Sequence, residues 1–163
     1  MKQVIVLQVN GEEHEVAVDL DATLLQALRE DLGLLGTKRG CDSGGCGSCT
    51  VLADGKAVYS CMTYALSVHD KQITTIEGLV TDGRLDPLQE AFVNAGAVQC
   101  GYCTCGMIMT ARQLLNEEAA PDEERIRHAI AGNLCRCTGY HKIVEAIGLA
   151  ARADARIEGG ERT

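Results

Sequence analysis

The sequence predicts an α+β fold, in which a small β-sheet that grips one helix is followed by a helical second half. Strand and turn signals fill the first 77 residues, whereas apolar residues recur with the helical period of 3.6 after them. The 163 residues also include nine cysteines but one phenylalanine and no tryptophan. Small domains with so few aromatic residues need another source of stability, and the cysteines are the candidates for it.

The first half begins with a β-hairpin and a helix. Val4 to Val9 is rich in β-branched residues, Asn10-Gly11 is a two-residue turn signal, and apolar residues alternate again from His14 to Val18. Thr23 is a candidate N-cap, after which leucines recur at helical spacing until Gly33. We expect this helix to pack on the sheet.

A second hairpin and a last strand complete the predicted sheet. Thr50 to Ala53 and Ala57 to Tyr59 flank the turn Asp54-Gly55, and Gln72 to Ile76 forms the closing strand.

The second half contains four predicted helices, which fit a four-helix arrangement. Their apolar positions are Leu88, Ala91 and Phe92 after Pro87; Met107, Ile108, Ala111, Leu114 and Leu115; Ile126, Ala129 and Ile130 after Pro121-Asp122; and Ile143, Ile147 and Ala150. We therefore predict two domains, 1–77 and 78–153, followed by a charged tail, 154–163, that frays.

Charge and hydropathy exclude several classes of partner. A net charge of −8 argues against nucleic acid and anionic membranes, whose binding needs basic patches. The apolar run near the N-terminus, Val4 to Leu7, is too short for a signal peptide, and no apolar stretch approaches the 18 residues of a membrane span. We expect a cytoplasmic protein, in which clustered cysteines indicate metal ligands more readily than disulfides.

The first cysteine group has the spacing of a plant-type [2Fe-2S] cluster. Four, two and eleven residues separate its successive members, which are Cys41, Cys46, Cys49 and Cys61. The loop that carries the first three is rich in glycine, which permits positive φ and lets backbone N–H groups approach the sulfides.

The second cysteine group lies just before two of the predicted helices. Its members are Cys100, Cys103, Cys135 and Cys137. Helix N-termini present free N–H groups to an anion, so four thiolates on two such turns suit a second [2Fe-2S] cluster. A four-cysteine zinc site is the alternative, more so for this group than for the first, because structural zinc has no need of a glycine-rich loop.

Cys105 is the ninth cysteine. It is interpreted either as a small buried side chain at a helix start or as a spare ligand or redox-sensitive thiol. The sequence contains no P-loop, dinucleotide fingerprint or nucleophile motif, so no substrate-transforming site is predicted in this chain.

Three segments resemble the small iron-sulfur subunit of the xanthine oxidase family of molybdenum hydroxylases: Lys38 to Val51, Gln99 to Met107 and Gly132 to Tyr140. The resemblance implies a plant-ferredoxin-like β-grasp domain followed by an all-α four-helix-bundle domain, each with one [2Fe-2S] cluster. It also implies a large molybdenum-pterin subunit and a medium FAD subunit as partners, in a dimer of heterotrimers. The family usually has proline where Cys105 stands, so the cluster and packing must hold this turn.

The resemblance also gives the order of the two clusters. The ligands of the cluster nearer the flavin would be Cys41, Cys46, Cys49 and Cys61, and those of the cluster nearer molybdenum Cys100, Cys103, Cys135 and Cys137. Gln99 and Cys137 would lie against the pterin. The alternatives are a free-standing two-cluster ferredoxin and a zinc-stabilised adaptor without redox activity.

Overall fold

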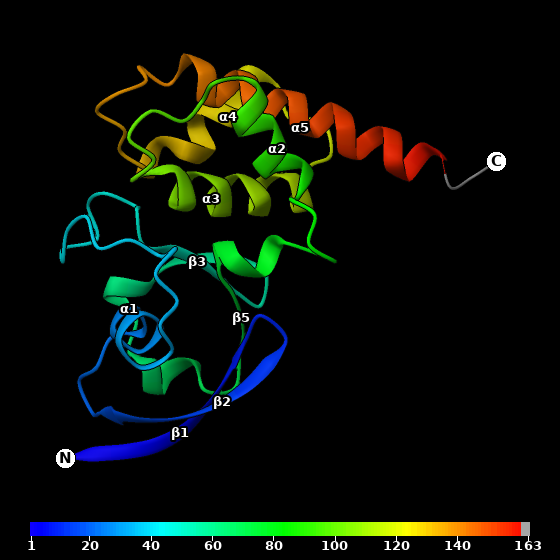
Figure 1. The fold of residues 1–163 in the computed structure, drawn as a ribbon. Coiled ribbons are helices and arrows are strands. Elements are labelled where there is room, and N and C mark those ends of the chain that lie inside the picture. Colours follow the sequence, from blue (N-terminus) through cyan, green and yellow to red (C-terminus); the bar gives the residue numbers. More distant parts are fainter. Residues whose placement is uncertain (161–163) are drawn as a thin grey trace.

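The computed structural model describes residues 1–160, together with the side chains of residues 1–153. A mixed sheet with short helical turns forms the first half of the chain, and four α-helices form the second, so the predicted α+β class is correct (Figure 1).

The sheet has five strands in the order β2-β1-β5-β3-β4, and only β1 and β5 run parallel. The strands are β1 (Lys2–Val9), β2 (Glu12–Asp19), β3 (Thr50–Ala53), β4 (Lys56–Tyr59) and β5 (Gln72–Thr74). Both predicted hairpins form. Their turn pairs have positive φ throughout, 55° and 81° at Asn10-Gly11 and 50° and 78° at Asp54-Gly55, as tight hairpins require.

The closing strand is shorter than predicted. It ends at Thr74, and Ile76 begins the 3₁₀ turn η4 (Ile76–Leu79). The reason is that Ile76 and Leu79 pack against the core of the helical half.

The helix that packs on the sheet starts where the sequence predicts. Thr23 caps α1 (Leu24–Gln26), and Gln26 returns a hydrogen bond in a capping box. The helix then widens into a π-helical turn, η1 (Ala27–Asp31), a departure from the predicted regular helix. In this turn the N–H of Leu32 donates to the carbonyl of Ala27, five residues back, at 3.0 Å.

The helices of the second half begin near their predicted starts. They are α2 (Pro87–Asn94), α3 (Thr104–Glu117), α4 (Glu123–Ala129) and α5 (His141–Gly160); the remaining 3₁₀ turns are η2 (Ser60–Met62), η3 (Ala65–Val68) and η5 (Ile130–Gly132). Asp86 caps α2 with Pro87 at its first position, and Asp122 caps α4.

Helix α5 continues to Gly160, ten residues beyond the last predicted apolar position, Ala150. Most of the predicted tail, 154–163, therefore belongs to this helix, and residues 161–163 lie outside the described residues. That the end of the chain frays stays a prediction.

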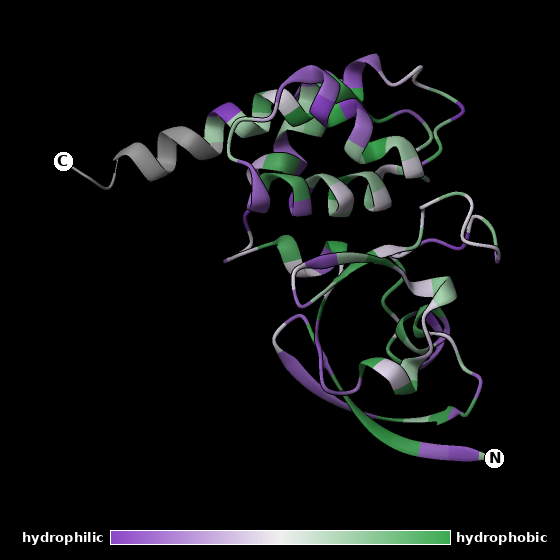
Figure 2. Ribbon diagram, turned by 180° about the vertical axis from the view of Figure 1, so that it is seen from behind, coloured by the Kyte–Doolittle hydropathy of each residue, from purple (hydrophilic) through white to green (hydrophobic). Residues whose placement is uncertain are grey.

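Each half has its own hydrophobic core. The first core lies between the sheet and α1 with η1, and the second is shared by α2, α3, α4 and α5. Figure 2 shows apolar and polar stretches alternating along the helices, as expected for helices with one buried face. Phe92, the one phenylalanine of the sequence, is 1 % exposed in the second core.

The two halves meet where α3 lies against β3 and β4 (Figure 1). At this contact the N–H of Ala57 at the sheet edge donates to Gln113 Oε1 on α3, at 2.7 Å. Further on, the hydroxyl of Tyr59 donates to the carbonyl of Gly132, at 3.1 Å. The two halves are thus joined through a sheet edge and a helix, which we call the joint, and the loops that carry the cysteines lie next to it.

Phe92→Ala tests the importance of the second core. Removing a fully buried aromatic ring leaves a cavity, so we expect the free energy of unfolding to fall by about 3–5 kcal/mol. Anaerobic urea unfolding of the iron-loaded chain measures it. Val93→Ala on the same helix, where the side chain is 64 % exposed, is the control and should change stability by less than about 0.5 kcal/mol. Equal effects of the two substitutions would contradict the described core.

Candidate metal centres

The first cysteine group is held by the loop before β3 and by the turn after β4. Cys41 and Cys46 lie on the outer part of the loop and contact each other through their side chains. Cys49 ends the loop beside β3, and Cys61 lies in η2, where its thiol contacts that of Cys49. The four thiols therefore form two neighbouring pairs, one partly exposed and one buried.

The glycines of this loop bring the backbone close to sulfur. Gly44 and Gly47 have φ of 71° and 70°, a region that side chains other than glycine rarely adopt. A Cβ on Gly40 would lie 2.9 Å from Cys46 Sγ. Because glycine has only a hydrogen atom in place of a side chain, the backbone of this loop can approach the sulfur atoms closely.

Hydrogen-bond donors make Cys41 acidic. The N–H of Ser43 is the largest influence and the Cys46 side chain the second, and together with the N–H groups of Cys46 and Gly45 they lower the pKa of Cys41 to about 6. The same inward-pointing N–H groups suit an anionic centre, because they stabilise negative charge on sulfur.

The buried pair behaves in the opposite way. Burial and then the hydrogen bond with Cys49 raise the pKa of Cys61 to about 11. A bare thiolate is therefore unfavourable at this point, whereas a bound cation would stabilise it. The environment of Cys61 suits a metal ligand better than a reactive free thiol.

The second group also consists of two pairs, each joining residues distant in sequence. Cys100 Sγ and Cys137 Sγ are 3.6 Å apart and exposed. Cys103, the N-cap residue of α3, contacts the side chain of Cys135. Burial, followed by the contact with Cys135, raises the pKa of Cys103 to about 12.

Thr138 and Tyr140 hold Cys135 in place. Burial alone would raise the pKa of this thiol, but hydrogen bonds with Thr138, Cys137 and Cys103 together outweigh burial, and the pKa is lowered. Thr138 Oγ1 lies 3.1 Å from Cys135 Sγ, and the N–H of Cys135 donates to the Tyr140 hydroxyl at 2.8 Å. Tyr140 has a φ of 69°, so its backbone is constrained to make this contact.

Paired thiols fit a two-iron centre. A [2Fe-2S] cluster takes four cysteine ligands, two for each iron, which separates them into pairs. Each group has this arrangement, so the donor sets fit two such clusters.

Gln99 and Cys105 have different surroundings. Gln99 is exposed beside Cys100, on the surface where the Cys100–Cys137 pair also lies. Cys105 is buried in the first turn of α3, which agrees with its interpretation as a small buried side chain at a helix start. Burial raises the pKa of its thiol. Its Sγ donates to the carbonyls of Ser48 and Tyr102, at 3.4 and 3.7 Å. The packing expected in place of the family's proline is therefore present.

The loops of the two thiol groups are in direct contact, which was not predicted from the sequence. We call this contact the seam; it is formed by Cys46, Gly47, Gly106 and Leu134. The N–H of Leu134, the neighbour of Cys135, donates to the carbonyl of Cys46 at 2.9 Å. Gly106, two residues into α3 from its start, packs so closely that a Cβ there would lie 2.1 Å from the carbonyl oxygen of Gly47. Gly106 directly precedes the apolar run that begins at Met107, and a glycine at this start of the predicted helix was a signal of the close approach.

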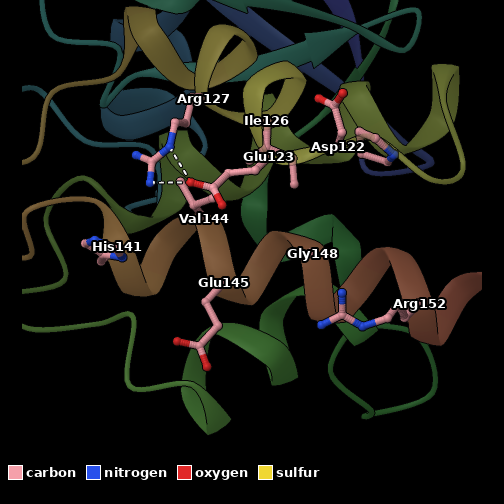
Figure 3. A pocket seen from close by; sticks show the side chains of 10 residues that line it. Asp122, Glu123, Ile126, Arg127, His141, Val144, Glu145, Gly148 and Arg152 are labelled. Carbon is pink, nitrogen blue, oxygen red and sulfur yellow. Dashed lines mark hydrogen bonds and ion pairs between the residues drawn. The ribbon is translucent and has the colours of Figure 1, made fainter.

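A groove of about 480 Å³ lies between α4 and α5, and Figure 3 shows the side chains that line it. Arg127 and Glu123 form an ion pair across one helical turn at its rim, 2.8 Å apart. The described residues that line it include no cysteine. The chemistry of the thiol groups thus lies outside this groove.

The described helices include none long and apolar enough to cross a membrane.

Comparisons with known proteins agree with the geometry of the thiols. Residues 7–74 match the family described as "2Fe-2S iron-sulfur cluster binding domain", and residues 75–148 match "[2Fe-2S] binding domain". The fold and the thiol groups together define an iron-sulfur protein.

Two relatives show to which kind of iron-sulfur protein the chain is similar. The nicotine 6-hydroxylase small subunit of Paenarthrobacter nicotinovorans is 50 % identical over 141 residues, which cover 86 % of this chain and 85 % of that protein. The nicotinate dehydrogenase small FeS subunit of Eubacterium barkeri is 47 % identical over 149 residues, covering 91 % and 95 %. The chain belongs to the xanthine oxidase family, as a small iron-sulfur subunit of an oxidoreductase complex, which confirms the resemblance seen in the sequence.

A solved structure has the same fold. The quinoline 2-oxidoreductase from Pseudomonas putida 86 superimposes with a TM-score of 0.91 and 44 % identity, over 95 % of this chain and 97 % of the matched chain.

Gly106→Ala tests the close packing of the seam. The added methyl group meets backbone atoms that cannot move aside, so we expect the free energy of unfolding to fall by about 1–3 kcal/mol in spite of the better helix propensity of alanine. Anaerobic urea unfolding measures this change.

Gly148→Ala is the matched control, because Gly148 is also inside a helix but its Cβ would make ordinary contacts, the nearest at 3.7 Å. The control should be neutral or stabilising. If Gly106→Ala were equally neutral, the close approach of α3 to the loop would be wrong.

Proposed function

We propose that this chain carries electrons one at a time between a molybdenum-pterin subunit and an FAD subunit, through two [2Fe-2S] clusters. The observation that supports this most is the hydrogen bond from the Leu134 N–H to the Cys46 carbonyl, at 2.9 Å. It joins the loop of one thiol group to the loop of the other, so two redox centres held there would be neighbours within one chain.

The proposed ligands follow the two groups of thiols. Cys41, Cys46, Cys49 and Cys61 hold one cluster, and Cys100, Cys103, Cys135 and Cys137 hold the other. The side-chain contacts suggest which thiols share an iron: Cys41 with Cys46, Cys49 with Cys61, Cys100 with Cys137, and Cys103 with Cys135. When bound, each cluster supplies a site that accepts and releases one electron.

The order of the clusters rests on the family. The group with Cys100 and Cys137 is proposed to face the molybdenum subunit, with Gln99 and Cys137 against the pterin. These three residues are exposed, as docking to a partner requires. The group in the glycine-rich loop is then the one nearer the flavin.

The same proposal covers the finer architecture and the setting. Domain 1–77 is a β-grasp unit of the plant-ferredoxin type, and domain 78–153 is a four-helix bundle. The chain assembles with the molybdenum and FAD subunits into a dimer of heterotrimers in the cytoplasm. The names of the relatives, which include a nicotine hydroxylase and a nicotinate dehydrogenase, point to a small N-heterocyclic substrate for the complex.

Two other functions would leave different signs. A free-standing two-cluster ferredoxin would be fully active without partners, whereas the relatives of similar length are named as small subunits. A zinc-stabilised adaptor would be colourless. Co-purification of the tagged chain with two larger chains, one containing molybdenum and one FAD, is the expected result; a chain isolated alone and fully active in electron transfer would contradict the assembly.

Metal content is the first prediction. Anaerobically purified chain should be brown and contain about four irons and four acid-labile sulfides, because two [2Fe-2S] clusters need that number. Iron and sulfide analysis with parallel zinc analysis measures this. Zinc in place of iron, without labile sulfide, would exclude the proposal.

Substitution of single ligands tests the order of the clusters in the complex. Cys46→Ser should lower iron to about two per chain and block flavin reduction while the molybdenum centre is still reduced by substrate. Cys103→Ser should also remove one cluster but leave electrons at molybdenum.

Cys105→Ala is the matched control for both ligand variants, since Cys105 is buried between the groups but is not a proposed ligand. It should keep about four irons. Flavin reduction that persists in Cys46→Ser would show the order to be wrong, and loss of iron in Cys105→Ala would make that thiol a ligand.

A further inference from the structure

Asn133 is a buried polar residue at the seam, and the proposed function gives it no role. Asn133 as a whole is only 2 % exposed to solvent. Asn133 Nδ2 donates to the Gly47 carbonyl at 2.9 Å and approaches Thr50 Oγ1 at 3.4 Å, both in the first half of the chain. Its Oδ1 accepts from Thr110 Oγ1 on α3 at 3.0 Å. One amide therefore connects three elements and has its hydrogen bonds satisfied within the protein.

The backbone on either side of Asn133 connects the two thiol groups. Leu134 follows it and donates its N–H to the Cys46 carbonyl, and Cys135 comes next in the chain. The carbonyl of Asn133 itself accepts from the Tyr140 hydroxyl, at 3.4 Å. A member of the first thiol group and a member of the second are thus separated by one hydrogen bond and one residue.

The Asn133 amide holds both sides of this junction. It is bonded to Gly47, which follows Cys46, and it lies on the residue that precedes Leu134. The donor and the acceptor of the Leu134–Cys46 hydrogen bond are therefore positioned by one side chain. Buried amides that are fully hydrogen-bonded hold their surroundings in a single arrangement, because any displacement leaves polar groups unpaired.

We propose that Asn133 is a positioning residue for electron transfer between the two clusters: its amide keeps the Leu134–Cys46 hydrogen bond closed, and this bond connects the two cluster loops. The inference rests on the proposed function, because it concerns transfer between clusters that the two thiol groups hold. It adds a residue that is neither a ligand nor a contact to a partner.

Asn133→Ala removes the amide without adding charge. We expect iron content to stay at the wild-type level, since no ligand changes. Hydrogen exchange at the Leu134 amide, followed by mass spectrometry of a peptide that contains it, should be faster than in wild type. A sub-stoichiometric flash reduction with rapid-freeze EPR should show slower arrival of the electron at the cluster of the glycine-rich loop.

Tyr59→Phe is the matched control. The Tyr59 hydroxyl makes a neighbouring hydrogen bond between the halves, to the Gly132 carbonyl at 3.1 Å, but it does not contact Leu134 or Gly47 through any described bond. This variant should keep wild-type exchange at Leu134 and the wild-type transfer rate. Equal slowing in Tyr59→Phe would overturn the proposal, because it would indicate general loosening of the joint.

Thr110→Val covers the case in which Asn133→Ala loses iron or unfolds. It removes only the hydroxyl that donates to Asn133 Oδ1, and it should give smaller changes in the same directions. Wild-type exchange and transfer rate in a variant that keeps its iron would overturn the role of Asn133. Absence of any electron transfer between clusters in the wild-type chain would instead overturn the proposed function, so the two failures can be told apart.

Discussion

The backbone carbonyls of Gly47 and Ser48 are the point at which the two halves of the chain are fixed to each other. The Gly47 carbonyl accepts hydrogen bonds from the N–H and hydroxyl of Thr50, at 3.2 and 2.7 Å, and from Asn133 Nδ2 at 2.9 Å. The Ser48 carbonyl accepts from the Lys38 N–H and the Cys105 thiol, at 3.3 and 3.4 Å. Donors from both halves thus converge on the carbonyls of two successive residues, which lie between Cys46 and Cys49.

This constraint explains why small residues occur where the halves touch. Gly47 has positive φ and a neighbour in Gly106, whose missing side chain lets α3 approach the carbonyl oxygen. The approach brings Cys103, at the start of α3, and Cys135, one residue after Leu134, to the same side of the joint as the glycine-rich loop. The two cores are small, and the single phenylalanine of the sequence lies in the second one. Hydrogen bonds and, on the proposed function, metal ligation fix the position of one core relative to the other.

Local signals in the sequence predicted local structure well. Asn10-Gly11 and Asp54-Gly55 adopt the backbone of tight hairpin turns, Thr23 caps its helix, and Asp122 begins α4 as its N-cap, because each feature depends on a few adjacent residues. The division of eight cysteines into two groups followed from spacing alone. The family and the α+β class were therefore available before any coordinates.

Features that depend on distant residues were not predicted. The parallel pairing of β1 with β5 joins residues more than 60 positions apart, and the hydrogen bond from the Leu134 N–H to the Cys46 carbonyl joins residues 88 positions apart. No local pattern specifies such contacts, since packing of the whole chain decides them. Asn133 was noticed only as part of a motif, because a buried hydrogen-bonding role cannot be read from an asparagine in a loop.

On the proposed function one chain holds two distinct [2Fe-2S] centres, and EPR of the fully reduced protein counts them. Each reduced cluster carries one unpaired electron, so the account predicts about two spins per chain, in two signals with different g values and relaxation. Cys46→Ser should remove one signal and Cys103→Ser the other. A single signal of about one spin per chain, or a protein without a signal, would contradict the account.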